Sequence, residues 1–149
     1  MASLNPILLV EDNPKDLELT LAALGKCQLA NEIVIARDGA EALDYLYMTG
    51  GFTEREAGDP AVVLLDLKLP KVDGLEVLEK IKKDAARRQI PIVMLTSSRE
   101  ERDLVKSYQL GVNAFAVKPV DFNAFFEAIQ DLGMFWAILN EPPPRGVNG

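Results

Sequence analysis

AVVLLDLKLPKVDG, residues 61–74, is the stretch of this 149-residue chain that decides the fold. Its apolar run, Val62–Leu65, has the length of a short strand and no polar position, as a strand buried on both faces requires. Pro70 and the Asp-Gly pair at 73–74 then turn the chain outward. Asp66 therefore lies at the carboxyl end of a buried strand, where open α/β sheets keep their active sites.

Four other apolar runs have the length of strands, and a helical pattern follows each of the five. The predicted strands are Ile7–Val10, Ile33–Ala36, Val62–Leu65, Ile92–Leu95 and Ala114–Val117. Strands that alternate with helical patterns of about 10–15 residues indicate crossover connections and a parallel sheet with helices on both faces. The sequence therefore predicts a (βα)5 doubly wound, five-stranded α/β fold with the flavodoxin-like strand order 2-1-3-4-5.

Capping residues mark where the predicted helices begin. Asn13, followed by Pro14, opens the first helix, which we expect to end at Gly25. Asp121 opens the fifth. The second, third and fourth begin at residues that precede a glutamate by the offset of a capping box: Asp38 before Glu41, Asp73 before Glu76, and Ser98 before Glu101.

Two segments lie outside this alternation. Residues 48–60 contain glycine clusters and no usable periodicity, so they predict an extended loop. The fifth helix is expected to extend to residue 139, which closes one domain over residues 1–139, and a Pro/Gly-rich tail at 140–149 is disordered or held against the surface. The sheet-facing stripe of the fifth helix should consist of Phe122, Phe125, Phe126, Ile129, Leu132, Trp136 and Leu139.

The composition fits one globular domain and excludes several functions. The chain is 48% hydrophobic and 26% charged, which is enough for one core. Its net charge of -7 repels nucleic acid and anionic membranes, so we expect neither as a partner. The sequence has no signal peptide and no segment that would span a bilayer, and we expect a cytoplasmic protein.

Cysteine and histidine usage narrows the chemistry further. The single cysteine, Cys27, has no neighbours that suggest an activated thiol, and we expect a structural role. The chain has no histidine, which excludes Ser-His-Asp and Cys-His relays, histidine-bound zinc and a phosphohistidine on this chain. A phosphoryl group accepted here would have to go to a carboxylate.

Glu11 and Asp12 follow the first predicted strand directly. Because the first and third strands are neighbours at the switch point of the predicted order, both acids should converge with Asp66 in one crevice. Carboxylates so close raise one another's pKa and are tolerated when a cation binds among them. Mg²⁺ suits such oxygen ligands. Alternatively, Glu11 and Asp12 are ordinary acids at a loop entrance of an acidic protein.

Thr96 and Lys118 follow the fourth and fifth predicted strands. A phosphoryl group on Asp66 would need a metal for part of its charge, a hydroxyl donor for one oxygen and an ammonium for another. Thr96 and Lys118 supply the last two. Taken singly, either residue has a structural interpretation, but signals at four strand ends together favour the functional one.

Four motifs, in this order, resemble the receiver domain of two-component response regulators: VEDN at 10–13, LLDLKLPKVDG at 64–74, LTSS at 95–98 and VKP at 117–119. The resemblance covers Leu4–Leu132. It implies that Asp66 accepts phosphate from the phosphohistidine of a sensor histidine kinase. It also implies a protein whose only chemistry is Mg²⁺-dependent self-phosphorylation and self-dephosphorylation.

The same resemblance assigns roles to individual residues. The implied Mg²⁺ ligands are Glu11, Asp12, Asp66 and the backbone carbonyl of Lys68. Thr96 and Lys118 contact the phosphoryl group, and the Lys118–Pro119 peptide bond is cis. In the implied switch, Thr96 moves toward the phosphate and the ring of Phe115 turns into the vacated space. Alternatively, Phe115 is an ordinary core aromatic.

The 48–60 segment and the Phe-Trp pair at 135–136 are also similar to the single-domain response regulators paired with bacterial phytochromes. Because we expect no second domain, the output has to pass through association. We predict a homodimer formed by the fourth and fifth helices, the fifth strand and the extension. The interface residues of the extension are Met134, Phe135, Trp136 and Ile138. Alternatively, the extension bends at Gly133 and packs on its own domain.

Two other classes of function are alternatives. An aspartate-nucleophile phosphatase resembling the haloacid dehalogenases would carry an Asp-x-Asp pattern, and Lys68 stands where its second aspartate is required. A constitutive adaptor would have kept the fold and lost the switch, which the intact strand-end residues argue against. Nucleotide or flavin binding has no support, because no glycine-rich phosphate loop follows the first strand.

Overall fold

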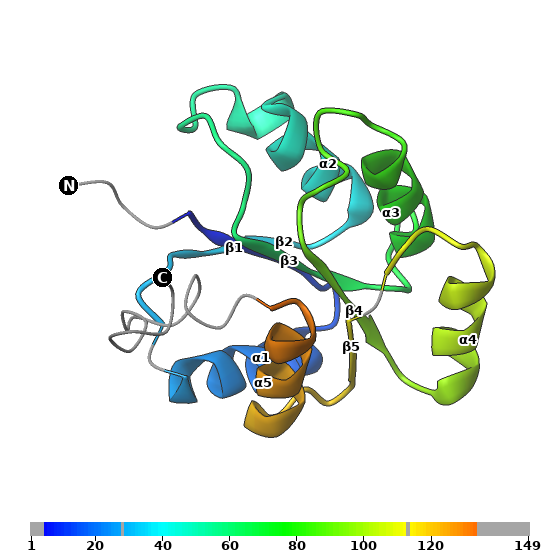
Figure 1. Ribbon diagram of the computed structural model, residues 1–149. Coiled ribbons are helices and arrows are strands. Elements are labelled where there is room, and N and C mark those ends of the chain that lie inside the picture. The colour runs from blue at the N-terminus through cyan, green and yellow to red at the C-terminus, as the bar shows by residue number, and fades with distance from the viewer. Residues whose placement is uncertain (1–4, 28, 113, 134–149) are drawn as a thin grey trace, which may run out of the picture.

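Five parallel strands form a single sheet in the order β2-β1-β3-β4-β5 (Figure 1). The computed structural model describes residues 5–27, 29–112 and 114–133. The strands are β1 (Ile7–Val10), β2 (Ile33–Ala36), β3 (Val62–Asp66), β4 (Ile92–Thr96) and β5 (Ala114–Val117). The predicted fold class and strand order are confirmed. β3 and β4 extend one residue further than predicted, so that Asp66 and Thr96 are the last residues of their strands.

Helices cover both faces of the sheet, as a doubly wound fold requires (Figure 1). They are α1 (Pro14–Lys26), α2 (Gly39–Tyr47), α3 (Gly74–Lys82), α4 (Arg99–Ser107) and α5 (Phe122–Asp131), with a short 3-10 helix, η1 (Gly50–Phe52), after α2. α1 and α5 pack on one face, and α2, α3 and α4 pack on the other. Among the described residues, none of these helices has the length and apolar character needed to cross a membrane.

Strand residues alternate between the two apolar layers. On β1, Leu8 and Val10 join the layer under α2 and α3, while Ile7 and Leu9 join the layer under α1 and α5. All four side chains are fully buried. Because helices cover both faces, the strands are continuous apolar runs, and polar residues appear only where the strands end.

The predicted capping residues are confirmed at all five helices. Each accepts a hydrogen bond from a backbone N–H of the first helical turn; they are Asn13, Asp38, Asp73, Ser98 and Asp121. Asp73 and Glu76 form a complete capping box. The predicted end of α1 at Gly25 is wrong by one residue, because Gly25 keeps a helical conformation and the helix continues to Lys26.

Residues 48–60 form the predicted loop, which contains η1 and is organised around Arg55. The Arg55 guanidinium lies 4.1 Å from the centroid of the Tyr45 ring, and its Nε donates to the Tyr45 carbonyl oxygen at 2.7 Å. Phe52, at the end of η1, meets the same ring edge to face at 5.2 Å. These contacts join single residues rather than a repeating set, so they leave no periodic signal in the sequence.

The sheet-facing stripe of α5 differs from the prediction at two phenylalanines. Phe122 is 38% exposed and Phe126 is half-buried, and their rings stack with centroids 5.7 Å apart. The buried residues of the helix are Phe125, Ala128 and Ile129. The small residue Ala128 belongs to the buried stripe. The centre of this stripe therefore lies nearer to Phe125 than the positions of the large apolar residues alone predict.

α5 ends before residue 139, to which the sequence predicts that it extends. α5 ends at Asp131, and Gly133 has a φ of 69°, a left-handed conformation that is common just after a helix end. The predicted interface residues Met134, Phe135, Trp136 and Ile138, the stripe residue Leu139 and the 140–149 tail lie outside the described residues.

Candidate functional site

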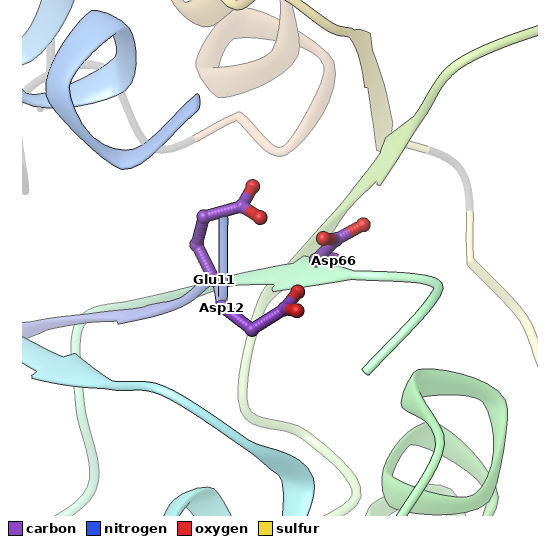
Figure 2. Close-up of side chains that lie close together, drawn as sticks. All are labelled: Glu11, Asp12 and Asp66. Carbon is purple, nitrogen blue, oxygen red and sulfur yellow. The ribbon is translucent and has the colours of Figure 1, made fainter. Parts of the chain in front are cut away.

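The carboxyl ends of β1 and β3 bring three carboxylates together. Val10 is level with Leu65 in the parallel register, so the residues that follow them, Glu11 and Asp66, are neighbours across the sheet. Asp12 joins them, and one carboxylate oxygen from each of the three acids lies within 4.8 Å of the others (Figure 2). The structure therefore places the three predicted acids in one cluster.

Glu11 is the most constrained of these acids. Its side chain is fully buried, whereas Asp66 is 3% exposed and Asp12 is exposed. Burial, together with a hydrogen bond to Asp66 and repulsion from its charge, raises the pKa of Glu11 to about 7. Its Oε2 accepts the Asn13 N–H at 3.2 Å. The folded protein therefore holds a carboxylate that resists ionisation at neutral pH.

Lys118 brings a positive charge into the cluster from the end of β5. Its Nζ lies 3.0 Å from Asp66 Oδ2 and 3.4 Å from Glu11 Oε1. Burial on its own lowers the pKa of Lys118, but the hydrogen bond and attraction to Asp66, with help from the other acids, raise the pKa above its usual value. The ammonium is therefore charged throughout the physiological range. The predicted cis bond between Lys118 and Pro119 is present.

Asp16 is a fourth carboxylate that the sequence analysis missed. Its Oδ2 lies 3.1 Å from Lys118 Nζ, although the two residues are far apart in the sequence. Asp16 stands in the first turn of α1, directly before the buried Leu17. The sequence did contain a signal for Asp16. α1 begins just after Asp12, so its first turn lies at the carboxyl edge of the sheet, and an acid in that turn is close to the site.

Thr96 ends β4 beside Asp66 and carries a buried hydroxyl. The side chain is 1% exposed, and its Oγ1 has no hydrogen-bond partner among the described residues. A buried polar atom without a partner costs about 1–3 kcal/mol, so it needs a reason. A ligand oxygen on Asp66 would provide the missing partner.

Phe115 lies on β5 on the same face of the sheet as Thr96. It is level with Met94, which precedes Thr96 by two positions, and side chains two positions apart point to the same face. The ring is half-buried against the apolar layer of that face, and Lys106 Nζ of α4 lies 5.6 Å from its centroid. The structure thus brings the predicted Thr96 and Phe115 pair to one side of β4 and β5.

The sequence matches the family model of the response regulator receiver domain over residues 7–130. The chain belongs to this family. Receiver domains are signalling regulators that partner with histidine kinases, so membership argues against the phosphatase alternative. The acidic cluster of this receiver fits a divalent metal ion.

Its similar proteins include response regulators of phytochromes. The bacteriophytochrome response regulator AtBRR is 74% identical, with a TM-score of 0.89, over 94% of this chain and 100% of that chain. The bacteriophytochrome response regulator RtBRR is 64% identical, with a TM-score of 0.88, over 95% of this chain and 85% of that chain. The response regulator Rcp1 of Synechocystis sp. is 38% identical over 130 residues, 87% of each protein. The Mn²⁺-bound form of Rcp1 has a TM-score of 0.71 at 37% identity, over 93% of this chain and 99% of that chain.

Two further residues of the receiver position Asp66 from the segment after β3. The Lys68 N–H donates to Asp66 Oδ1 at 3.4 Å. The Lys68 carbonyl as a metal ligand stays a prediction. Gly74 donates its N–H to the Leu67 carbonyl at 2.9 Å, and a Cβ at Gly74 would collide with the carbonyl oxygen of Asp66. Only glycine therefore lets α3 begin this close to the site.

Proposed function

We propose that this receiver is a phosphorylation-controlled binding switch in which Asp66 accepts a phosphoryl group from the phosphohistidine of a sensor histidine kinase. The proposal rests on the groups that surround the carboxylate of Asp66. Its carboxylate ends a buried strand, with an acidic pair at the end of β1 and an unpartnered hydroxyl at the end of β4. The ammonium of Lys118 lies against it at 3.0 Å.

The balance of charge supports a divalent cation among the acids. Three carboxylates, those of Glu11, Asp16 and Asp66, pair with the ammonium of Lys118, and Asp12 adds a fourth beside Glu11 and Asp66. Burial, and after it the hydrogen bond and the charge of the neighbouring Asp66, raise the pKa of Glu11. We propose Mg²⁺, held by Glu11, Asp12, Asp66 and the Lys68 carbonyl. When bound, the ion would neutralise part of the charge of a transferring phosphoryl group.

The other residues have separate tasks in the proposed transfer. A carboxylate oxygen of Asp66 attacks the phosphorus of the phosphohistidine, the phosphorus–nitrogen bond breaks, and the imidazole of the kinase leaves. Lys118 pairs with one phosphoryl oxygen, and the Thr96 hydroxyl donates to another. Attack by water on the phosphorus later restores Asp66 and releases phosphate. The chemistry is therefore limited to self-phosphorylation and self-dephosphorylation.

Thr96 and Phe115 are the proposed switch. Thr96 and Phe115 lie on the same face of the sheet. If Thr96 moved toward a phosphoryl group, space would open on this face, and the half-buried ring of Phe115 would turn inward to fill it. Phenylalanine has no hydroxyl, so the ring cannot offer a partner a hydrogen bond. The signal would then be a change in the shape of the surface formed by α4 and β5.

That surface supports a homodimer through α4, β5 and α5. Four of the five large apolar side chains that the described residues expose lie on or directly after these elements. They are Leu104, Tyr108, Val117 and Phe122. Such a patch is typical of an interface. We propose that the extension with Met134, Phe135, Trp136 and Ile138 completes it, within a domain of residues 1–139 followed by the 140–149 tail.

Sedimentation velocity tests the dimer with a matched pair of substitutions. Leu104→Glu should abolish self-association, while Leu19→Glu, which alters the exposed leucine on α1, should leave it intact. Equal loss of self-association in both variants would overturn the dimer, as would a wild type that stays monomeric at all concentrations with and without beryllofluoride.

For the kinase we propose a bacterial phytochrome, because the chain is similar to AtBRR and RtBRR, and we propose a cytoplasmic protein.

Acetyl phosphate tests the central proposal without the kinase. With Mg²⁺, the receiver should acquire an acid-stable, base-labile phosphoryl group, and Asp66→Asn should abolish it. Asp59→Asn, at an exposed acid in the loop before β3, is the control and should leave it in place. Absence of modification in the wild type would favour the constitutive adaptor.

A further inference from the structure

A side-chain bridge joins the segment after β3 to the start of α4, close to Asp66. Lys68 Nζ lies 3.3 Å from Glu101 Oε2. The two partners differ in freedom, since the Lys68 side chain is 79% exposed and that of Glu101 is 15% exposed. The bridge therefore joins an exposed ammonium to a largely buried carboxylate.

The β4–α4 turn holds Glu101. Its Oε1 accepts the Ser97 N–H at 2.7 Å, and its own N–H donates to Ser98 Oγ at 3.2 Å. Ser97 directly follows Thr96, whose hydroxyl has no hydrogen-bond partner in the described part of the chain. Glu101 is thus tied to the turn that a phosphoryl group on Asp66 would engage, and Lys68 is the partner that is free to move.

Lys68 is anchored within reach of the same phosphoryl group. Its N–H donates to Asp66 Oδ1, while its ammonium stands on a flexible four-carbon stem. Phosphorylation replaces the single negative charge of Asp66 by the roughly doubled charge of an acyl phosphate. The attraction of Lys68 toward Asp66 therefore rises, whereas its attraction toward Glu101 stays the same.

We propose that Glu101 holds the Lys68 ammonium away from Asp66 in the resting receiver, and that the phosphoryl group captures this ammonium. Lys68 is then a further phosphoryl-binding residue, and Glu101 is a positioning residue that competes for it. The exchange removes a tie between the β3–α3 segment and α4 at the moment of phosphorylation. The inference rests on the proposed function, because it requires a phosphoryl group on Asp66.

The chain supplies a matched control for this bridge. Lys71 Nζ lies 3.4 Å from Asp38 Oδ2, with the two side chains 70% and 17% exposed, and Asp38 is the N-cap of a helix, α2. This second bridge has nearly the same distance and exposure, but it connects to α2 rather than to α4. Glu100, exposed and one residue before Glu101, controls for the loss of charge alone.

Calorimetric titration with beryllofluoride, an anionic mimic of the phosphoryl group, in excess MgCl₂ measures the competition. Lys68→Gln should weaken binding about two- to fivefold, the effect of an exposed ion pair, and Glu101→Gln should tighten it by a similar factor. Glutamine at 101 keeps an oxygen for the Ser97 N–H. In the double variant the affinity should equal that of Lys68→Gln, and Lys68→Arg should bind like the wild type.

The controls Lys71→Gln, Asp38→Asn and Glu100→Gln should leave the affinity unchanged. Tightening by Glu101→Gln that persists in the Lys68→Gln background would overturn the inference, because Glu101 would then act through its charge. Unchanged affinity in both single variants, with normal binding by the wild type, would also overturn it and leave the proposed function standing. Only a wild type that neither binds beryllofluoride nor reacts with acetyl phosphate would overturn both.

Discussion

Replacing Glu11 with glutamine tests the electrostatic strain in the acidic cluster. Burial and the neighbouring Asp66 raise the Glu11 pKa from an ordinary 4.5 to about 7 in the folded protein. The folded state therefore binds a proton that the unfolded chain has already lost, so the contribution of Glu11 to stability is fully present below pH 4.5 and is lost as the pH rises to 7. Each tenfold change in acidity corresponds to about 1.4 kcal/mol, which makes the loss about 3 kcal/mol.

Urea unfolding in EDTA, followed by circular dichroism between pH 4.5 and 8, measures this loss. Glu11→Gln cannot ionise, so it should have nearly wild-type stability at pH 4.5 and exceed the wild type by about 2–3 kcal/mol at pH 8, allowing for lost attraction to Lys118. Glu18→Gln, at an exposed position of α1, is the control and should follow the wild type at every pH. A difference between Glu11→Gln and the wild type that stays constant from pH 4.5 to 8 would refute the reasoning.

Four other substitutions should have effects that differ in direction. Mg²⁺ should raise the melting temperature of the wild type, because a ligand of the folded state stabilises that state, and Asp12→Ala should abolish this rise. A rise that persists in Asp12→Ala would show that the metal binds elsewhere. Thr96→Val removes a buried hydroxyl that has no partner among the described residues, so urea unfolding should show an unfolding free energy about 1 kcal/mol higher. The same substitution should weaken the binding of beryllofluoride. A variant less stable than the wild type would show that the Thr96 hydroxyl does have a partner. Gly74→Ala drives a Cβ into the Asp66 carbonyl and should cost roughly 2–4 kcal/mol in the same assay. Gly25→Ala meets no atom within 4 Å and should stabilise by up to about 1 kcal/mol, so equal effects at the two glycines would exclude the collision.

The central site residues could be predicted from the sequence because their signals are local. A strand covered on both faces is a continuous apolar run, so the first polar residue after it marks the carboxyl edge of the sheet. Asp66 and Thr96 were found in this way, and the regular alternation of strands and helices predicted which strand ends are neighbours. The capping pairs were equally local, and for that reason the helix starts were predicted well.

Asp16, Arg55 and Phe122 show where local signals fail. Asp16 reaches Lys118 across more than a hundred positions, and only the assembled sheet brings the two together. Arg55 organises its loop through one ring and a few carbonyl oxygens, which have no periodicity. Phe122 is apolar yet exposed, because the phase of α5 is set by how Phe125 packs on the sheet rather than by apolarity alone.

Two unfavourable features of the resting receiver flank Asp66. β3 lies between β1 and β4, so Glu11, with its raised pKa, lies on one side of Asp66, and Thr96, whose hydroxyl has no partner among the described residues, lies on the other. A ligand shifts a conformational equilibrium only by the difference between its affinities for the two states. A metal among the acids would relieve Glu11, which directly follows β1. A phosphoryl group relieves Thr96, which is continuous with the turn that leads through Ser97 to Glu101 and α4. We therefore expect metal binding to act mainly on stability, and phosphorylation to act mainly on the surface of α4 and β5.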